Sequence, residues 1–183
     1  CNAKTVSEFH IKKGYCKNKI DIINNGFSLH KDSMNKERFL NKIDGLDSNS
    51  LIIGTVGRYD KLKDYPNMIN AFSIIMKDYP NAHLLMVGRG LDSSNAKLMS
   101  MLSNSIDISK VHLLGERGGI SDYLSIMDIF CLSSRNEGFP NVVAEAMLMK
   151  IPCVVTDAGD AASLVSDIGI LVPVEDHIKL ALG

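Results

Sequence analysis

The stretch that decides the fold is IFCLSSRNEGFPNVVAEAMLMKIPCVVTDAG, residues 129–159. It begins with the apolar run IFCLSS and ends with a second apolar run, CVVTDAG. Between them, Gly138 and Pro140 disfavour helix, whereas NVVAEAMLM from Asn141 onward predicts one. A strand, a helix and a second strand in this order indicate two parallel strands joined by a helical crossover.

The helix predicted from Asn141 is apolar on nearly every face, which is typical of a buried helix. Its one carboxylate, Glu145, would then need a partner, because burying an unpaired charge is costly. Asn141 is suited to cap this helix, so that its free backbone N–H groups face the mouth of the loop. Glu137 in the loop adds a second carboxylate. Amides for an anion and carboxylates for hydroxyl groups together fit a phosphorylated sugar, although each glutamate could instead be a solvated surface charge.

The same alternation of apolar runs and helical periods extends over most of the chain. Strands are predicted at residues 19–24, 51–57, 83–88, 111–115, 129–134, 153–159 and 169–174. Helices are predicted at residues 64–80, about 92–105, 121–127 and from 141 onward, with one weak helix within 30–50. Continuously apolar strands separated by helices indicate a Rossmann-like α/β domain, a parallel sheet with helices on both faces.

Composition narrows the classes of function. The 183 residues suffice for one well-buried domain, and a net charge of −1 provides no overall field for nucleic acid or anionic membrane. No apolar run approaches the roughly 20 residues of a membrane span. The four cysteines and five histidines have no metal-ligand spacing, so we expect no metal and a reducing, cytoplasmic setting.

Ligands of such sheets bind beyond the carboxyl ends of the strands. Arg58, Arg89 and Arg117 follow the glycines that end three of the predicted strands, and Arg135 lies in a fourth such loop. In GRYDKLK, Arg58 offers a forked donor and Lys63 a point charge, a combination suited to a diphosphate. Lys61 competes with Lys63 for this role. The alternative interpretation is a solvated, lysine-rich turn.

These segments resemble a known family. The motifs are NNG (24–26), VGRYDKLKDYPNMINAF (56–72), LLMVGRG (84–90), VHLLG (111–115) and DIFCLSSRNEGFPNVVAEAMLMKIPCVVTDAGDAASLV (128–165). Together they are similar to the carboxy-terminal domain of glycosyltransferase family 4, retaining sugar transferases with the two-domain GT-B fold. The most specific element is S-x-x-E-G-F-P-x-x-x-x-E-A, and the resemblance covers nearly the whole chain.

The resemblance implies roles for particular residues. Arg58 and Lys63 match the pair that contacts the diphosphate of the donor, and Glu137 matches the carboxylate at its sugar. Glu145 matches the carboxylate that accepts from the ribose hydroxyls. The amides of the loop and helix start match the group that binds sugar hydroxyls and the distal phosphate, and Glu116 and Arg117 lie in the base-contacting loop. The remaining implied donor contacts are Gly57, Gly88, Gly138, Phe139, Pro140, Asn141 and Val142.

The chain departs from the family pattern in two places. Lys150 stands where glycine is usual, which alters a tight turn. Gly159-Asp160 and Ser163 stand where many members have two glycines and a glutamate. Both changes are expected to affect selectivity, and neither touches the diphosphate contacts.

We therefore expect residues 20–183 to form the donor domain, cut short at its carboxy-terminal end. Residues 1–19 would connect it to a missing amino-terminal domain that binds a glycan or lipid-linked acceptor. The predicted reaction is sugar transfer from a nucleotide-diphosphate donor with retention of configuration, without a metal, for polysaccharide biosynthesis. Any membrane contact would belong to the missing domain, and this chain alone would transfer little. The alternatives are a sugar-nucleotide epimerase of similar fold and a non-catalytic nucleotide-binding module.

Overall fold

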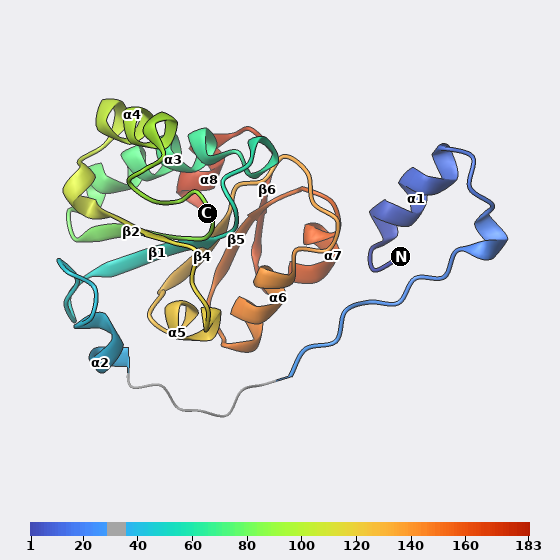
Figure 1. Cartoon of the computed structure of the whole chain (residues 1–183), viewed down its shortest axis with the longest axis horizontal. Helices are drawn as coiled ribbons and strands as arrows, with labels where there is room; N and C mark the ends of the chain where they lie inside the picture. Colours follow the sequence, from blue (N-terminus) through green and yellow to red (C-terminus); the bar gives the residue numbers. More distant parts are fainter. Residues whose placement is uncertain (29–35) are drawn as a thin grey trace.

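A computed structural model describes residues 1–28 and 36–183, and residues 36–183 form one parallel sheet flanked by helices (Figure 1). The sheet has six strands in the order β3-β2-β1-β4-β5-β6, and every neighbouring pair is parallel. The predicted Rossmann-like α/β fold is confirmed. The strands are β1 (Leu51–Val56), β2 (Ala82–Val87), β3 (Val111–Gly115), β4 (Ile129–Leu132), β5 (Cys153–Thr156) and β6 (Ile170–Val172).

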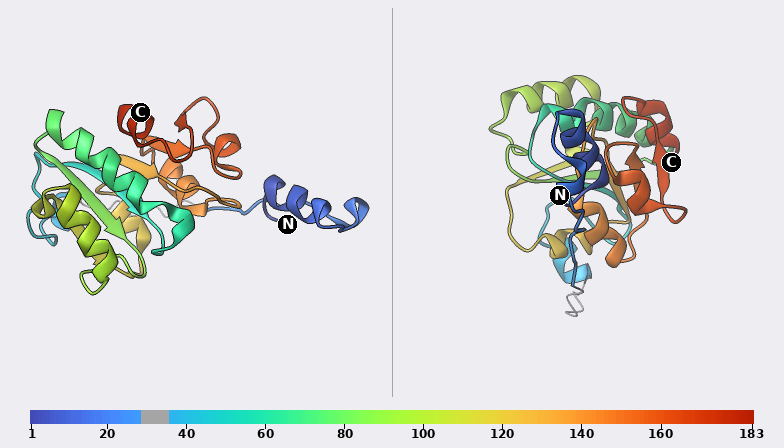
Figure 2. Two further views of the ribbon diagram at one scale, coloured as in Figure 1. Left: turned by 90° about the horizontal axis from the view of Figure 1, so that it is seen from above. Right: turned by 90° about the vertical axis from the view of Figure 1, so that its right-hand side faces the viewer.

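Helices cover both faces of the sheet (Figures 1 and 2). One face carries α2 (Lys36–Leu40), α5 (Ile120–Leu124), α6 (Asn141–Leu148) and α7 (Ala161–Val165). The other face carries α3 (Tyr65–Asp78), α4 (Ala96–Ser105) and α8 (His177–Leu182). Short 3₁₀ turns occur at η1 (Lys17–Lys19), η2 (Lys61–Lys63) and η3 (Ile108–Lys110).

Two apolar clusters, one on each face, hold these layers together. Successive strand residues point to opposite faces, so Ile52 packs in one cluster and Ile53 in the other. Leu85 and Leu84 alternate in the same way, and all four are at most 5% exposed. Burial on both faces explains why these strands are continuously apolar instead of alternating with polar residues.

The prediction of a strand at residues 19–24 is wrong. Beyond η1, residues 20–28 form an extended segment without strand pairing, and Ile22 and Ile23 are 46% and 75% exposed. The apolar run has no neighbouring strand among the described residues to complete a ladder. The weak helix expected within 30–50 is α2, and residues 29–35 lie outside the described part of the chain.

The amino-terminal segment projects away from the sheet, with α1 (Lys4–Lys12) lying beyond α7 in Figure 1 and apart from the sheet in the left view of Figure 2. Neither α1 nor any other helix in the described part of the chain has the length and apolar character needed to cross a bilayer.

Two histidines that are 29 positions apart meet where β2 and β3 lie side by side. Nδ1 of His83 and Nε2 of His112 are 2.9 Å apart, and both rings are buried. Burial, together with the neighbouring His83 and Lys110, lowers the pKa of His112 to about 4. Burial also lowers the pKa of His83, with Lys110 acting in the same direction and Asp47 against it. The pair stays neutral near pH 7.

Candidate functional site

The strand order reverses between β1 and β4, and the largest group of predicted site residues lies at their carboxyl ends. In an open parallel sheet this reversal leaves a crevice between the loops that leave the two strands. A cavity of about 630 Å³ occupies this position. It is lined by Val56, Gly57, Arg58, Lys63, Gly88, Arg89, Glu116, Arg117, Glu137, Phe139, Pro140, Asn141 and Val142.

The loop after β1 carries the two predicted cations. Its shape is set by Asp60, whose carboxylate accepts the backbone N–H of Leu62 at 2.9 Å and caps η2. That hydrogen bond, opposed by slight desolvation and aided by the nearby Arg58, lowers the pKa of Asp60. The Arg58 side chain is 62% exposed, and its Nε lies 3.5 Å from Asp60. The Arg58 side chain is therefore well solvated and only loosely paired with Asp60.

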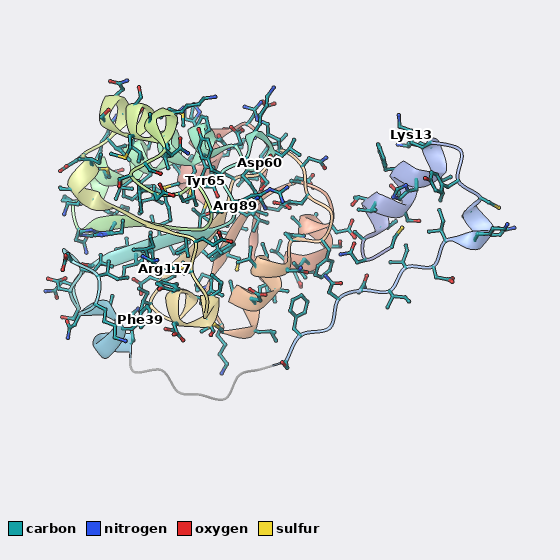
Figure 3. The ribbon with its side chains drawn as sticks, in the orientation of Figure 1. Lys13, Phe39, Asp60, Tyr65, Arg89 and Arg117 are labelled. Atoms are coloured by element: carbon teal, nitrogen blue, oxygen red, sulfur yellow. The ribbon has the colours of Figure 1, made fainter. Side chains whose placement is uncertain are left out.

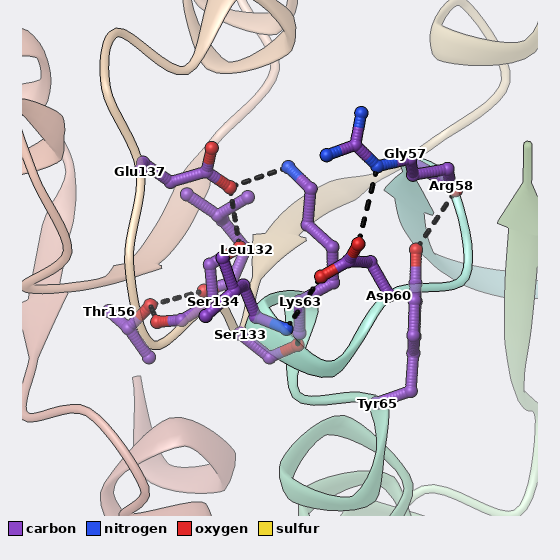
Figure 4. A network of polar contacts seen from close by, with 11 residues as sticks. Gly57, Arg58, Asp60, Lys63, Tyr65, Leu132, Ser133, Ser134, Glu137 and Thr156 are labelled. Carbon is purple, nitrogen blue, oxygen red and sulfur yellow. Dashed lines mark hydrogen bonds and ion pairs between the residues drawn. The ribbon is translucent and has the colours of Figure 1, made fainter.

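Lys63 and Glu137 face each other across the cavity floor (Figure 4). Nζ of Lys63 lies 2.5 Å from Oε1 of Glu137, and the hydroxyl of Ser134 donates to the same oxygen at 2.6 Å. The two charged side chains are only 22% and 12% exposed, so the pair is weakly screened by solvent. Lys61, the competing candidate, is exposed and does not line the cavity.

Backbone contacts fix the place of the β1 loop. The hydroxyl of Tyr65 donates to the carbonyl of Gly57 at 3.0 Å (Figure 4), and burial raises the pKa of this phenol. Gly88 at the end of β2 packs so closely that a Cβ there would lie 2.1 Å from the Gly57 carbonyl oxygen. With a φ of +144°, Gly88 also has a backbone that side chains disfavour. The close approach of the ends of β1 and β2 thus requires glycine at position 88.

Helix α6 begins at Asn141, but the prediction that the Asn141 side chain caps it is wrong. Pro140 is the N-cap residue, and no side chain caps the helix. The Asn141 side chain instead accepts from Nδ2 of Asn25 at 2.5 Å. The first-turn amides of Asn141 and Val142 have no partner within the helix, and both residues line the cavity. The expected group of amides therefore lies where the sequence placed it, without the expected cap.

Glu145 and Gly138 do not line the cavity. The expectation that Glu145 is buried and needs a partner is also wrong, because α6 exposes one side and leaves Glu145 half-buried. Leu148 on the same helix is 37% exposed. The apolar composition of α6 predicted more burial than this eight-residue helix receives, since one side of it remains exposed.

The loops after β2 and β3 complete the rim. Glu116 and Arg117 line the cavity as expected, and both are exposed. Arg89 also lines it, although the sequence marked this residue only as part of a basic rim (Figure 3). Its position directly after Gly88, equivalent to that of Arg58 after Gly57, is the signal that could have identified it. Val56 is a further lining residue that the sequence gave no reason to select.

The amino-terminal segment also contacts residues at the junction of the β4–α6 loop and α6, which line the cavity. The rings of Phe27 and Phe139 stack with their centroids 6.0 Å apart. Asn25, the second residue of the NNG motif, donates to Asn141 as described above. The motif therefore contacts the first residue of α6, and Phe27 next to it contacts the loop before this helix, links that the sequence alone did not indicate.

Comparison with known proteins identifies the family of this chain. The model of the family described as glycosyl transferases group 1 matches residues 50–182. A UDP-Gal:alpha-D-GlcNAc-diphosphoundecaprenol alpha-1,3-galactosyltransferase of Escherichia coli is 30% identical over 81% of this chain and 39% of its own length. The capsular polysaccharide biosynthesis glycosyltransferase CapM of Staphylococcus aureus is 27% identical over 90% of this chain and 44% of its own. The chain thus spans about two fifths of these curated relatives.

Solved structures share the fold. The Anabaena protein HepE, crystallised with UDP and glucose, superposes with a TM-score of 0.87 at 22% identity, covering all of this chain and 51% of HepE. The carboxy-terminal domain of LpcC from Francisella tularensis superposes with a TM-score of 0.64 at 23% identity, covering 81% of this chain and 80% of that domain. This coverage identifies the fold as one half of the two-domain GT-B architecture. Because the family model spans most of the chain, this protein belongs to the glycosyl transferases group 1 family and corresponds to the carboxy-terminal domain of its members.

Proposed function

We propose that this chain is the donor-binding half of a glycosyltransferase that moves a sugar from a nucleotide-diphosphate donor to an acceptor with retention of anomeric configuration. The observation that carries the proposal is the convergence of Arg58, Lys63, Glu137 and the first turn of α6 on one cavity. The name of the Escherichia coli relative specifies a UDP-linked sugar, and HepE was crystallised with UDP and with UDP-glucose. These relatives make a nucleotide sugar the natural candidate ligand.

The cavity suits the charge that develops during transfer. The bond between the anomeric carbon and the diphosphate oxygen breaks with both electrons moving to the oxygen, so negative charge grows on the diphosphate. An acceptor hydroxyl oxygen forms the new bond to the anomeric carbon, and its proton passes to the departing diphosphate. Arg58 and Lys63 supply fixed positive charge there, and the amides of Asn141 and Val142 supply N–H donors. Lys63 already forms an ion pair with Glu137, so it is held at the cavity before any donor enters.

Glu137 has the complementary role at the sugar. Its second carboxylate oxygen can accept from sugar hydroxyls while Oε1 stays with Lys63 and Ser134. A negative charge at this place also favours the positive charge that develops on the sugar ring. Glu145 lies outside the cavity lining but one helical turn from Asn141, which lines it, and we propose that Glu145 accepts from ribose hydroxyls of a donor that extends along α6. Glu116 and Arg117 are proposed to flank the base.

We further propose that the reaction needs no divalent cation, because the two side chains and the helix amides neutralise the leaving group. If so, transfer by the longer protein is unchanged by excess EDTA. Loss of transfer on chelation, with recovery on adding Mg²⁺ or Mn²⁺, contradicts this part of the proposal.

The acceptor is proposed to be a glycan or a lipid-linked sugar held by a second, amino-terminal domain, of the kind that the length of the relatives implies. A closed cleft between two domains excludes water and completes such a site. We therefore expect this chain alone to bind the donor and to transfer little or nothing. Sugar transfer by this chain without the other half contradicts that expectation.

The proposal is tested by a thermal-shift panel of UDP-, GDP-, ADP- and CMP-linked sugars on this chain. One class of nucleotide-diphosphate sugar should raise Tm, and Lys63→Met should abolish the shift. Incubation of the longer protein with that donor then separates the reactions: acceptor-dependent release of the nucleotide, with the anomeric configuration of the product retained, supports transfer. Epimerised donor without acceptor, or no Tm shift with any member of the panel, contradicts it.

A further inference from the structure

A buried carboxylate outside the cavity caps a helix that is far away in the sequence. Asp160, at the start of α7, is only 7% exposed. Its Oδ2 accepts the backbone N–H of Lys4 at 2.6 Å, and its Oδ1 accepts that of Thr5 at 3.0 Å. The N-cap residue of α1 itself, Ala3, has no side-chain acceptor. Asp160 therefore does for α1 what an N-cap side chain usually does for its own helix.

The electrostatics agree with this role. Burial alone would raise the pKa of Asp160, but hydrogen bonds from Thr5 and Lys4 outweigh it and lower the pKa below its ordinary value. Among the salt bridges of the described residues, none involves Asp160. The carboxylate is thus stabilised mainly by hydrogen bonds from the first turn of α1, with a smaller contribution from the charge of Lys4.

The backbone of the same residue holds the turn that carries Glu137. The N–H of Asp160 donates to the carbonyl oxygen of Gly138 at 3.0 Å. The preceding Gly159 has a φ of +62°, and a Cβ there would lie 1.9 Å from the carbonyl oxygen of Glu137. The β5–α7 turn therefore packs directly against the Glu137–Gly138 peptide.

Helix α1 also approaches that peptide. A Cβ on Gly138 would lie 3.1 Å from Cγ2 of Val6, in the turn of α1 that Asp160 caps. The Glu137–Gly138 peptide thus lies close to both α1 and the β5–α7 turn, and Asp160 is hydrogen-bonded to α1 and to Gly138. A displacement of α1 would therefore reach the Glu137–Gly138 turn through Asp160 as well as through the packing of Val6.

We propose that Asp160 is a positioning residue for the donor sugar, fixing the Glu137–Gly138 turn by capping α1 with its carboxylate and holding Gly138 with its amide. Asp160 does not line the cavity and acts through Glu137. The inference rests on the proposed function, in which Glu137 contacts the sugar. It assigns a task to one of the two places where the sequence departs from the family pattern.

The test compares the affinities of Asp160→Ala for a nucleotide sugar and for its diphosphate. The probes are UDP-glucose with UDP, GDP-mannose with GDP and ADP-glucose with ADP, and the pair that binds the wild-type chain best is used. Because Glu137 is proposed to contact only the sugar, affinity for the nucleotide sugar should fall roughly tenfold, the size expected for losing one cap. Affinity for the diphosphate should fall much less. Asp160→Asn, which keeps one acceptor oxygen, should recover most of the loss.

Two controls separate positioning from general destabilisation. Asp176→Ala removes a matched cap, since the Asp176 carboxylate accepts the N–H of Lys179 at 3.0 Å at the start of α8, away from the cavity. It should leave both affinities unchanged. In a Glu137→Gln background, Asp160→Ala should add little further loss for the nucleotide sugar, because the two residues act as one unit. Faster amide exchange at Lys4 and Thr5 in Asp160→Ala should report loss of the cap without any ligand.

The outcomes are distinct. If the wild-type chain binds no nucleotide sugar of the panel, the proposed function fails and this inference fails with it. If the wild type binds but Asp160→Ala weakens sugar and diphosphate equally, or behaves like Asp176→Ala, the inference alone is overturned. A selective loss for the nucleotide sugar, absent in the Glu137→Gln background, supports it.

Discussion

Lys63 is the cation whose surroundings make it most effective at the cavity. Its ammonium is largely buried and lies 2.5 Å from Glu137, whereas the Arg58 side chain is 62% exposed. Charge–charge interactions strengthen as water is excluded, so the two cations should not contribute equally. This ranking could not be derived from the sequence, because GRYDKLK gives spacing and charge but not exposure.

Lys63→Met should therefore weaken binding of the nucleoside diphosphate by about 2–5 kcal/mol, the range for losing one partner of a desolvated charged contact. Arg58→Ala should cost less, about 1 kcal/mol or below, because its side chain is solvated. Calorimetry measures both, with Lys61→Met as the matched control on the same turn. Equal losses in Lys61→Met and Lys63→Met would contradict the assignment.

Lys150 is held in a left-handed backbone conformation with a φ of 63°. Side chains other than glycine are strained there, so the expectation of an altered tight turn at this position has a physical basis. Lys150→Gly should raise the free energy of unfolding by about 0.5–1 kcal/mol, since relief of strain exceeds the added freedom of the unfolded chain. Urea denaturation checks this against Lys150→Ala, which should give no gain. Destabilisation by Lys150→Gly would mean that the turn is unstrained.

At the scale of elements, apolar runs in the sequence predicted the six strands, whereas helices α1 and α7 were not predicted. Strands β1 to β6 were predictable because burial on both faces requires continuous apolar residues. Helices α1 and α7 were not predicted, although the equally short α2 and α5 were, so helices of five to nine residues were recognised only in part. The wrong strand at 19–24 shares isoleucines with the true strands, but it also contains Lys19, Asp21 and Asn24, whereas the true strands contain no charged residue.

The buried histidines of β2 and β3 make the free energy of unfolding depend on pH. The pKa of His112 is lowered from an ordinary value of 6.5 to about 4 in the folded protein, so the unfolded chain binds more protons between these values. The contribution of neutral His112 to the free energy of unfolding should be fully present above about pH 6.5. The free energy of unfolding should fall by about 2–3 kcal/mol as the pH decreases toward 4. The lowered pKa of His83 acts in the same direction.

Urea denaturation at several pH values measures this slope. His112→Asn should flatten it between pH 6.5 and 4, whatever its effect on stability at pH 7. His10→Asn, in the amino-terminal segment, should keep the wild-type slope. An unchanged slope in His112→Asn would exclude the buried pair as its source.

At the scale of the whole molecule, the sequence predicted the fold and most of the cavity. Arg58, Lys63, Glu137 and the start of α6 meet because parallel strands bring their carboxyl ends to one edge, which follows from the order of elements. The roles of Asp160 and the NNG motif could not be foreseen. They depend on contacts across more than 100 positions, between a projecting segment and the cavity loop.

The most direct test of the account is an NMR titration of this chain with UDP, GDP and ADP. The account predicts that one of them shifts the amide signals of Arg58, Lys63, Asn141 and Val142 together, with a single dissociation constant and weaker binding at higher salt. Shifts confined to unconnected surfaces, or binding by Lys63→Met that equals the wild type, would contradict the claim that these groups hold one diphosphate.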